Sequence, residues 1–116
     1  MSEELKKKLK GFGAFVSLVT NTTADYEVDV HMFREQVRFV MTGGIRGTTG
    51  ALLAAGGIGE GYFLNDEEWY AVIKAFAEEA VGKVITMAGV FDLSTKNAIR
   101  KIKFAEDLGI DLVQLA

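Results

Sequence analysis

The chain has 116 residues, 49% of them hydrophobic and 25% charged, with a formal net charge of −3 at pH 7. This composition is typical of a globular domain, or of part of one, and excludes a disordered tail. The sequence contains no cysteine and one histidine, which excludes disulfides and thiolate metal sites, so we expect neither a metal nor a cofactor.

The amino-terminal segment, residues 1–10, is charged and has no apolar core, so it predicts neither a signal peptide nor a membrane anchor. Its lysines follow Glu3 and Glu4, a pattern typical of a solvated helix face rather than of a polyanion site. The negative net charge provides no basic surface for nucleic acid. We therefore expect a cytoplasmic protein with no nucleic-acid or membrane partner.

The first strand is predicted at residues 12–20, which are rich in valine and phenylalanine, and a polar turn region follows at 21–27. Asp29 is the expected N-cap of a helix with one apolar face, which Gly43 and Gly44 end.

The second unit begins with a continuous apolar run at residues 51–55, which predicts a buried strand. In the helix that follows, Asn65 and Glu68 stand in capping-box positions, Trp69 begins the buried stripe, and Gly82 ends the helix.

The third unit has a strand at residues 84–90 and a helix that is capped by Ser94 or Thr95 and ended by Gly109. A fourth strand is predicted at residues 111–116.

This alternation predicts an α/β fold with a parallel sheet. The units are similar in length, and a polar or glycine-rich stretch follows each strand, which favours a (β/α)8 TIM barrel over a doubly wound sheet. A complete barrel takes about 250 residues. Residues 1–116 are therefore predicted to form one partial domain, the N-terminal half of such a barrel, with about three βα units plus strand four.

Two glycine turns flank the second strand, at residues 47–50 and 56–61. Barrel enzymes bind ligands at the carboxyl ends of strands, so the second turn, here called the glycine loop, is the predicted binding loop. Its backbone N–H groups lie near a helix start and suit a carboxylate or phosphate oxygen. A plain tight turn is the alternative. Dinucleotide binding is disfavoured because G-x-G-x-x-G would need glycine at Tyr62.

Several ordered motifs together resemble one family, the dihydrodipicolinate synthase and N-acetylneuraminate lyase superfamily of (β/α)8 barrels. The motifs are Leu18-Val19-Thr20, Gly56-Gly57-Ile58-Gly59-Glu60 with Leu64 and Asp66-Glu67-Glu68, Ala88-Gly89-Val90 with Ser94-Thr95, and the run at residues 105–111. The resemblance extends over residues 11–116.

The resemblance implies a lyase that binds pyruvate or a related 2-oxo acid as a Schiff base with a lysine. The family's G-[ST]-[ST]-G-E loop holds the substrate carboxylate. The substrate-binding residues carried over in this way are Gly57, Ile58, Gly59, Glu60 and Thr20.

Two features depart from the family pattern. Gly57 and Ile58 stand where the two hydroxyl residues should be, so their amides alone would bind a carboxylate, and Ile58 can relay no proton. This loop looks closer to the sugar-acid dehydratase branch. Residues 48–50 look inserted, and we expect them to lengthen the loop before strand two.

The family's Schiff-base lysine and catalytic tyrosine lie on the sixth and fifth strands, beyond residue 116. We therefore predict no catalytic residue in this chain, which would be the N-terminal part of a longer lyase and inactive alone. The lysines after the first segment are expected on solvated surfaces away from the barrel mouth: Lys74, Lys83, Lys96, Lys101 and Lys103.

Among the remaining candidates, the carboxylate of Glu60 is expected to bond the loop amides, and Ser94 to cap its helix. Asp92 follows strand three and is a candidate substrate contact. His31 is expected on the surface and Trp69 in the core.

Four strands cannot close a barrel, so inward side chains would face water beside unpaired strand edges. The side chains expected to face inward are Val16, Leu18, Leu53, Ala55, Ile85 and Met87. This predicts self-association, as a homo-oligomer or through the open face. Two non-catalytic alternatives therefore stand beside the lyase: a self-associating half-barrel and a small anion-binding module.

Overall fold

A computed structural model describes residues 2–11, 14–45 and 47–115. The elements in chain order are α1 (Glu3–Gly11), β1 (Ala14–Ser17), α2 (Val30–Thr42), β2 (Gly47–Ala54), the 3-10 helix η1 (Gly61–Phe63), α3 (Asp66–Ala80), β3 (Val84–Val90), α4 (Thr95–Asp107) and β4 (Leu112–Leu115).

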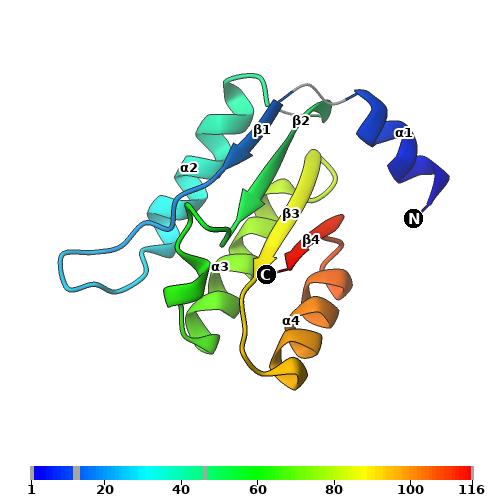
Figure 1. Ribbon diagram of the computed structural model, residues 1–116. Helices are drawn as coiled ribbons and strands as arrows, with labels where there is room; N and C mark the ends of the chain where they lie inside the picture. Colours follow the sequence, from blue (N-terminus) through cyan, green and yellow to red (C-terminus); the bar gives the residue numbers. More distant parts are fainter. Residues whose placement is uncertain (1, 12–13, 46, 116) are drawn as a thin grey trace.

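The four strands form one parallel sheet in the order β1-β2-β3-β4. Figure 1 shows α2, α3 and α4 together on one face of this sheet, and α1 apart from them near the amino ends of β1 and β2. Each strand is joined to the next through a helix, and all three crossovers lead to a neighbouring strand. The predicted run of parallel βα units is confirmed.

The helix boundaries follow the side-chain caps that the sequence predicts. The carboxylate of Asp29 accepts a hydrogen bond from the Met32 amide at 3.0 Å, and Ser94, rather than Thr95, caps α4 by accepting from the Asn97 amide. At α3 the capping box is complete, because Asn65 and Glu68 each accept a hydrogen bond from the other's backbone amide. These bonds satisfy orphan donors at the helix starts.

The strand at β2 is longer than predicted and includes residues 47–50, which were expected in a loop. The register pairs Gly47 with Val84 and Ala51 with Ile85, so four steps along β2 match a single step along β3. A Cβ on Gly50 would lie 2.9 Å from the Ala14 carbonyl oxygen. The extra residues are therefore absorbed as an irregularity within the strand rather than as a loop before it.

The strands at the two edges are shorter than predicted. β1 covers Ala14–Ser17, although the Leu18 amide still donates to the Leu53 carbonyl at 2.9 Å. Residues 12, 13 and 116, which the predicted strands included, lie outside the described residues.

The core lies between the sheet and its helices. Leu52, Ala54 and Ala88 from the strands pack with fully buried α3 side chains, among them Trp69 and Phe76. Trp69 is 1% exposed, which confirms its predicted place in the core.

The prediction for the inward face was wrong for β1. Leu18 belongs to the core on the helix side and Val16 packs against it, whereas Phe15, the neighbour of Ala51 in the sheet, is 48% exposed. Residues 12–20 carry apolar side chains in both alternations, so the sequence pattern did not determine which set faces the helices.

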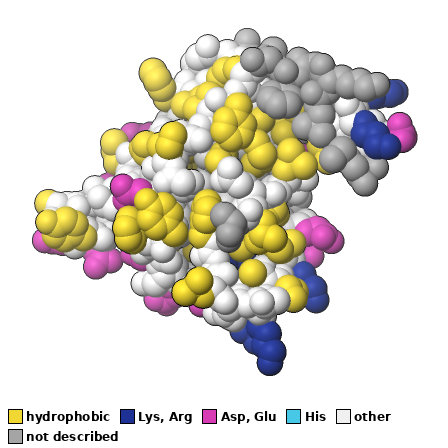
Figure 2. All heavy atoms as spheres, in the orientation of Figure 1, with side chains coloured by type: hydrophobic (Ala, Val, Ile, Leu, Met, Phe, Trp, Pro, Cys, Tyr) yellow, Lys and Arg dark blue, Asp and Glu magenta, His cyan; other side chains and the backbone are white. Residues whose placement is uncertain are grey.

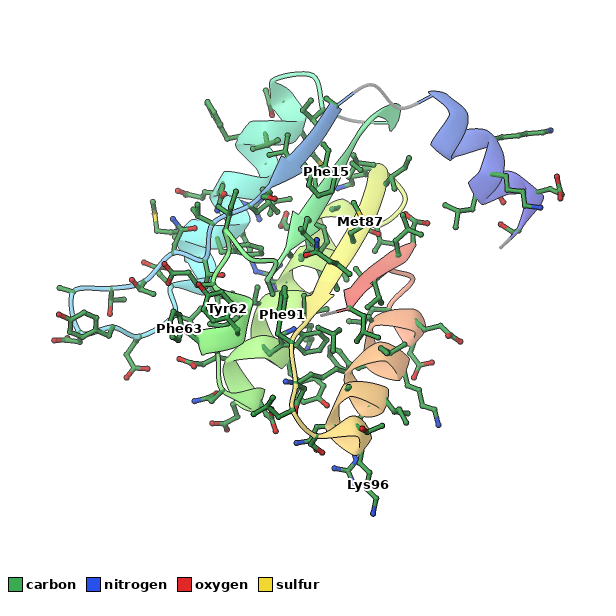
Figure 3. All side chains as sticks on the ribbon, viewed as in Figure 1. Phe15, Tyr62, Phe63, Met87, Phe91 and Lys96 are labelled. Carbon is green, nitrogen blue, oxygen red and sulfur yellow. The ribbon has the colours of Figure 1, made fainter. Side chains whose placement is uncertain are left out.

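The open face of the sheet is also less exposed than expected. Leu53 and Ile85 are buried and Met87 is half-buried. Ala55, expected to face inward, is buried in the core at the end of β2. Figure 2 shows hydrophobic side chains over this side of the molecule, and Figure 3 places Phe15 and Met87 on the sheet there.

Candidate functional site

The glycine loop is a compact turn at the carboxyl end of β2. Ala55 and Glu60 both have left-handed backbone, with φ of 55° at each. The Glu60 amide donates to the Gly57 carbonyl at 3.1 Å, and the Gly61 amide donates to the Gly56 carbonyl at 3.0 Å. The loop therefore lies between a strand and a helix, as predicted, and two of its own backbone hydrogen bonds hold the turn.

Three glycines at the carboxyl end of the sheet lie where a Cβ would meet backbone. A Cβ on Gly61 or on Gly89 of β3 would overlap the Ala55 carbonyl group, and a Cβ on Gly59 would lie 2.7 Å from the Leu18 carbonyl oxygen. Gly57 differs, because a Cβ there would have no heavy atom within 4 Å. Gly57 is therefore the glycine of this loop with free space beside it.

The amides of Gly57 and Ile58 are those that the loop offers on its exposed side. Both residues are exposed, Ile58 to 68%. Within the described part of the chain, neither amide donates to a protein acceptor. Two neighbouring unpaired N–H groups on an exposed turn can bind an anionic oxygen.

Thr20 holds the loop from the segment after β1. Its hydroxyl donates to the Gly59 carbonyl oxygen at 2.6 Å. Of the predicted site residues, Thr20 and Gly59 are therefore brought into direct contact.

The carboxylate of Glu60 does not bond the loop amides, contrary to the prediction. It makes no hydrogen bond to any residue that the structure describes, and the side chain is exposed. The left-handed backbone of Glu60 places this residue at the turn into η1.

A pocket of about 240 Å³ lies beside the loop, on the side of the segment after β1. It is lined by Thr20, Thr22, Tyr26, Val28, Glu60, Phe63, Leu64 and Glu68. Its ionisable carboxylates, Glu60 and Glu68, make it unsuited to an anion. The structure thus separates the predicted set: Thr20 and Glu60 line this pocket, while Gly57 and Ile58 lie outside it.

The helix start near the loop was expected to favour an anion, but it adds no donors to the loop. The residues of η1 separate the loop from α3, and the first turn of α3 carries Asp66, Glu67 and Glu68. The α3 dipole is therefore already matched by its own carboxylates. Anion binding would depend on the loop amides.

Aromatic rings gather where the loops after β2 and β3 meet. The Tyr62 ring lies 4.4 Å from that of Phe63 and 6.1 Å, edge to face, from that of Phe91. Figure 3 shows Tyr62, Phe63 and Phe91 together near the carboxyl ends of the strands, and Lys96 pointing away from them.

One lysine that was predicted on the surface is buried. Lys101 is 4% exposed, and its ammonium lies 2.9 Å from an oxygen of Asp92, 3.1 Å from one of Asp66 and 5.4 Å from the Trp69 ring centre. We call these four residues the Lys101 cluster. The other candidate lysines are exposed as expected: Lys74, Lys83, Lys96 and Lys103.

The sequence carried a signal for this burial that the prediction overlooked. Lys101 follows Ala98 by three positions and precedes Ala105 by four, so it lies on the same helix stripe as two buried residues. The prediction of a solvated position rested on its place on a helix face away from the barrel mouth, without regard to which stripe of the helix it occupies.

The charges in the Lys101 cluster stabilise one another. The Asp92 pKa is lowered, first by the Ser94 amide that donates to it and then by the hydrogen bond from Lys101. Burial opposes the charge of Lys101, but the hydrogen bonds to Asp92 and Asp66 outweigh it, so the Lys101 pKa is raised. Asp92 is therefore bound to its own helix start and to Lys101.

The described residues contain no group of three acidic or histidine side chains placed to hold a metal ion. His31 is on the surface as predicted, where it lies 3.2 Å from Glu35. Within the same part of the chain, no helix has the length and apolar character needed to cross a membrane.

Comparison with known proteins shows the family of the chain. The model of the dihydrodipicolinate synthetase family matches residues 10–115. This chain belongs to the dihydrodipicolinate synthetase family. The 4-hydroxy-tetrahydrodipicolinate synthases of Legionella pneumophila and Methanosphaera stadtmanae are 39% and 32% identical to it, over 84% and 86% of this chain.

Solved structures agree with this assignment. A putative dihydrodipicolinate synthetase from Pseudomonas aeruginosa superposes with a TM-score of 0.80 at 29% identity, over 89% of this chain and 34% of that one. The chloride inhibited dihydrodipicolinate synthase from Acinetobacter baumannii, complexed with pyruvate, gives 0.77 at 33% identity, over 89% and 34%. The parallel βα units of this dihydrodipicolinate synthetase family chain are therefore those of a TIM barrel, and they span about a third of these relatives.

We expect Gly61→Ala to lower the free energy of unfolding by about 1–3 kcal/mol, because its Cβ would overlap the Ala55 carbonyl group and force the backbone to move. Gly57→Ala is the matched control, since its Cβ meets open space, and should change stability by less than about 1 kcal/mol. Urea denaturation of both variants measures this. Equal losses would contradict the assigned contact.

Asp92→Asn should lower the free energy of unfolding by about 1 kcal/mol at neutral pH, because it removes the charge that Lys101 pairs with. Since the folded-state pKa of Asp92 is lowered, the advantage of the wild type is present above the ordinary aspartate pKa of about 3.9 and is lost as pH falls through the lower folded value. Denaturation of both proteins from pH 7 to pH 2 would show the difference disappearing. A pH-independent difference would exclude this origin.

Proposed function

We propose that this chain supplies the carboxylate-binding loop of a Schiff-base-forming lyase that acts on pyruvate or a related 2-oxo acid. The observation that carries the proposal is the pair of unpaired amides at Gly57 and Ile58, at the carboxyl end of β2. Ligands of TIM barrels bind at that end of the strands. The pyruvate complex of the Acinetobacter baumannii relative supports the substrate class.

In this proposal the amides of Gly57 and Ile58 donate to the substrate carboxylate. No protein atom crowds the open side of Gly57, so a ligand oxygen can reach its amide. Gly59 and Thr20 act on the ligand indirectly, because the hydrogen bond from the Thr20 hydroxyl to the Gly59 carbonyl fixes the loop. Glu60 lies in the same turn with its carboxylate in solvent, where it takes no part in holding the anion.

The covalent step needs groups outside this chain. A lysine amine condenses with the ketone and releases water, and the resulting iminium withdraws electrons from the adjacent bond. The buried Lys101 is paired with Asp92 and Asp66, and Lys74, Lys96 and Lys103 are exposed on α3 and α4. We infer that the lysine comes from a later part of a longer protein, and that this chain alone lacks activity.

Ile58 bears on which reaction the whole protein performs. Its side chain has no hydroxyl to join a proton relay through the loop, so a proton must be moved from elsewhere. We propose that this loop binds and orients a 2-oxo acid but relays no proton itself. The sugar-acid dehydratase branch is proposed on the likeness of the loop sequence alone.

Pyruvate should shift the backbone amide resonances of Gly57 and Ile58 in nitrogen–proton NMR spectra, saturably and in the millimolar range that a small ligand on an open loop can reach. Gly57→Asp should abolish the shift by placing a carboxylate where the anion binds, whereas Gly57→Ala keeps both amides and should retain it. A wild-type spectrum unchanged by pyruvate would refute the proposal.

A second candidate, self-association through the open sheet face, is favoured by the 48% exposure of Phe15 on that face. Sedimentation velocity should show reversible association of the wild-type chain as its concentration rises, and Phe15→Ser should weaken it. Phe39→Ser is the control, because Phe39 is 79% exposed on α2, on the other side of the sheet. A wild-type monomer at every concentration would remove this candidate.

A further inference from the structure

The Lys101 cluster joins three segments of the chain around one buried cation. Lys101 comes from α4, Asp92 from the segment after β3, and Asp66 and Trp69 from the first turns of α3. Replacing buried ion pairs by apolar side chains is often neutral or stabilising. Stability alone is therefore a weak account of a lysine at this position.

Asp66 connects the cluster to the end of the glycine loop. It follows the helix cap Asn65. Two hydrogen bonds lead back to the loop, from the Phe63 amide to the Glu60 carbonyl and from the Leu64 amide to the Gly61 carbonyl. Fixing the position of Asp66 therefore also fixes the segment that connects the glycine loop to α3.

Trp69 connects the cluster to the start of the same loop. Its indole N–H donates to the Gly89 carbonyl at 2.8 Å, and Gly89 packs so closely on the Ala55 carbonyl group that no Cβ fits between them. Ala55 is the residue immediately before the loop. The cation of Lys101 lies over the ring that makes this bond.

Asp92 adds a third connection through the aromatic rings. It is the neighbour of Phe91, whose ring meets the Tyr62 ring of η1. The hydrogen bonds from the Ser94 amide at 2.8 Å and from Lys101 at 2.9 Å hold the Asp92 carboxylate from two sides. The segment after β3 is thereby held against the segment after β2.

We propose that Lys101 is a positioning residue for the glycine loop, which it fixes at its end through Asp66, at its start through Trp69, and at η1 through Asp92. The role of the loop in binding a carboxylate rests on the proposed function, but the positioning itself does not. Lys101 touches no part of the anion site. It acts by keeping the amides of Gly57 and Ile58 in one arrangement, which lowers the cost of ordering them around a ligand.

The chain offers a matched control on the same helix layer. Arg38 of α2 pairs with Glu79 near the end of α3 at 2.7 Å, through two nitrogens of its guanidinium. This pair joins two helices as the Lys101 cluster does, but it lies at the opposite end of α3 from Asp66. Both variants lose an ion pair between helices, although the Arg38 side chain is 56% exposed and that of Lys101 is 5% exposed.

The test compares Lys101→Met and Arg38→Met with the wild type by amide hydrogen exchange. Lys101→Met should speed exchange of the Glu60 and Gly61 amides, which are bonded inside the loop, by about tenfold relative to the amides of α2. It should also weaken pyruvate binding at Gly57 and Ile58 by about fivefold. Arg38→Met should leave the loop amides and pyruvate binding as in the wild type.

Unchanged loop exchange in Lys101→Met, or an equal change in both variants, would overturn the positioning role. If the wild type binds no pyruvate, the proposed function fails, while the exchange rates still decide the role of Lys101.

Should Lys101→Met not fold, Asp92→Asn replaces it, because the amide oxygen of asparagine can still accept from Ser94. Faster exchange of Glu60 and Gly61 is then expected, and wild-type rates would overturn the proposal.

Discussion

The arrangement of the segments at the carboxyl ends of β2 and β3 depends on one close contact, in which the backbone of two glycines lies against the carbonyl group of Ala55. Gly61 and Gly89 both pack against it where a Cβ would overlap it, and Ala55 itself has left-handed backbone to turn the chain there. Left-handed backbone in a residue other than glycine costs about 1 kcal/mol or more. The contact with Gly61 folds the glycine loop back onto the end of β2, and the contact with Gly89 brings β3 against the same point.

As a result of this packing, some glycines of the loop make structural contacts and another is left open to a ligand. Gly56, Gly59 and Gly61 are occupied by contacts with neighbouring protein atoms, which leaves Gly57 with open space and an unpaired amide. A binding loop of this kind needs no polar side chain at its centre, because the backbone supplies the donors. Stability and ligand access are therefore served by different residues of one short loop, and the Lys101 cluster supports it from the outer layer.

Much of the fold was predictable because local signals and the global fold agree. Asn65 with Glu68, Ser94 and Asp29 cap the helices as their sequence positions indicate, and the parallel order follows from the alternation of strands and helices. Predictions were wrong where a pattern allowed two answers, as in the alternation of β1 that decides whether Val16 or Phe15 faces the helices. They were also wrong for interactions between distant segments, as for Lys101 and the irregular start of β2. The glycine loop was found from its position after a strand, but its unpaired amides required the structure.

The measurement that tests the central claim most directly is a crystal structure of this protein with bound pyruvate. The account predicts one pyruvate carboxylate oxygen within hydrogen-bond distance of the backbone nitrogens of Gly57 and Ile58, with the Thr20 hydroxyl still bonded to the Gly59 carbonyl. A carboxylate bound elsewhere, with these two amides facing water, would contradict it.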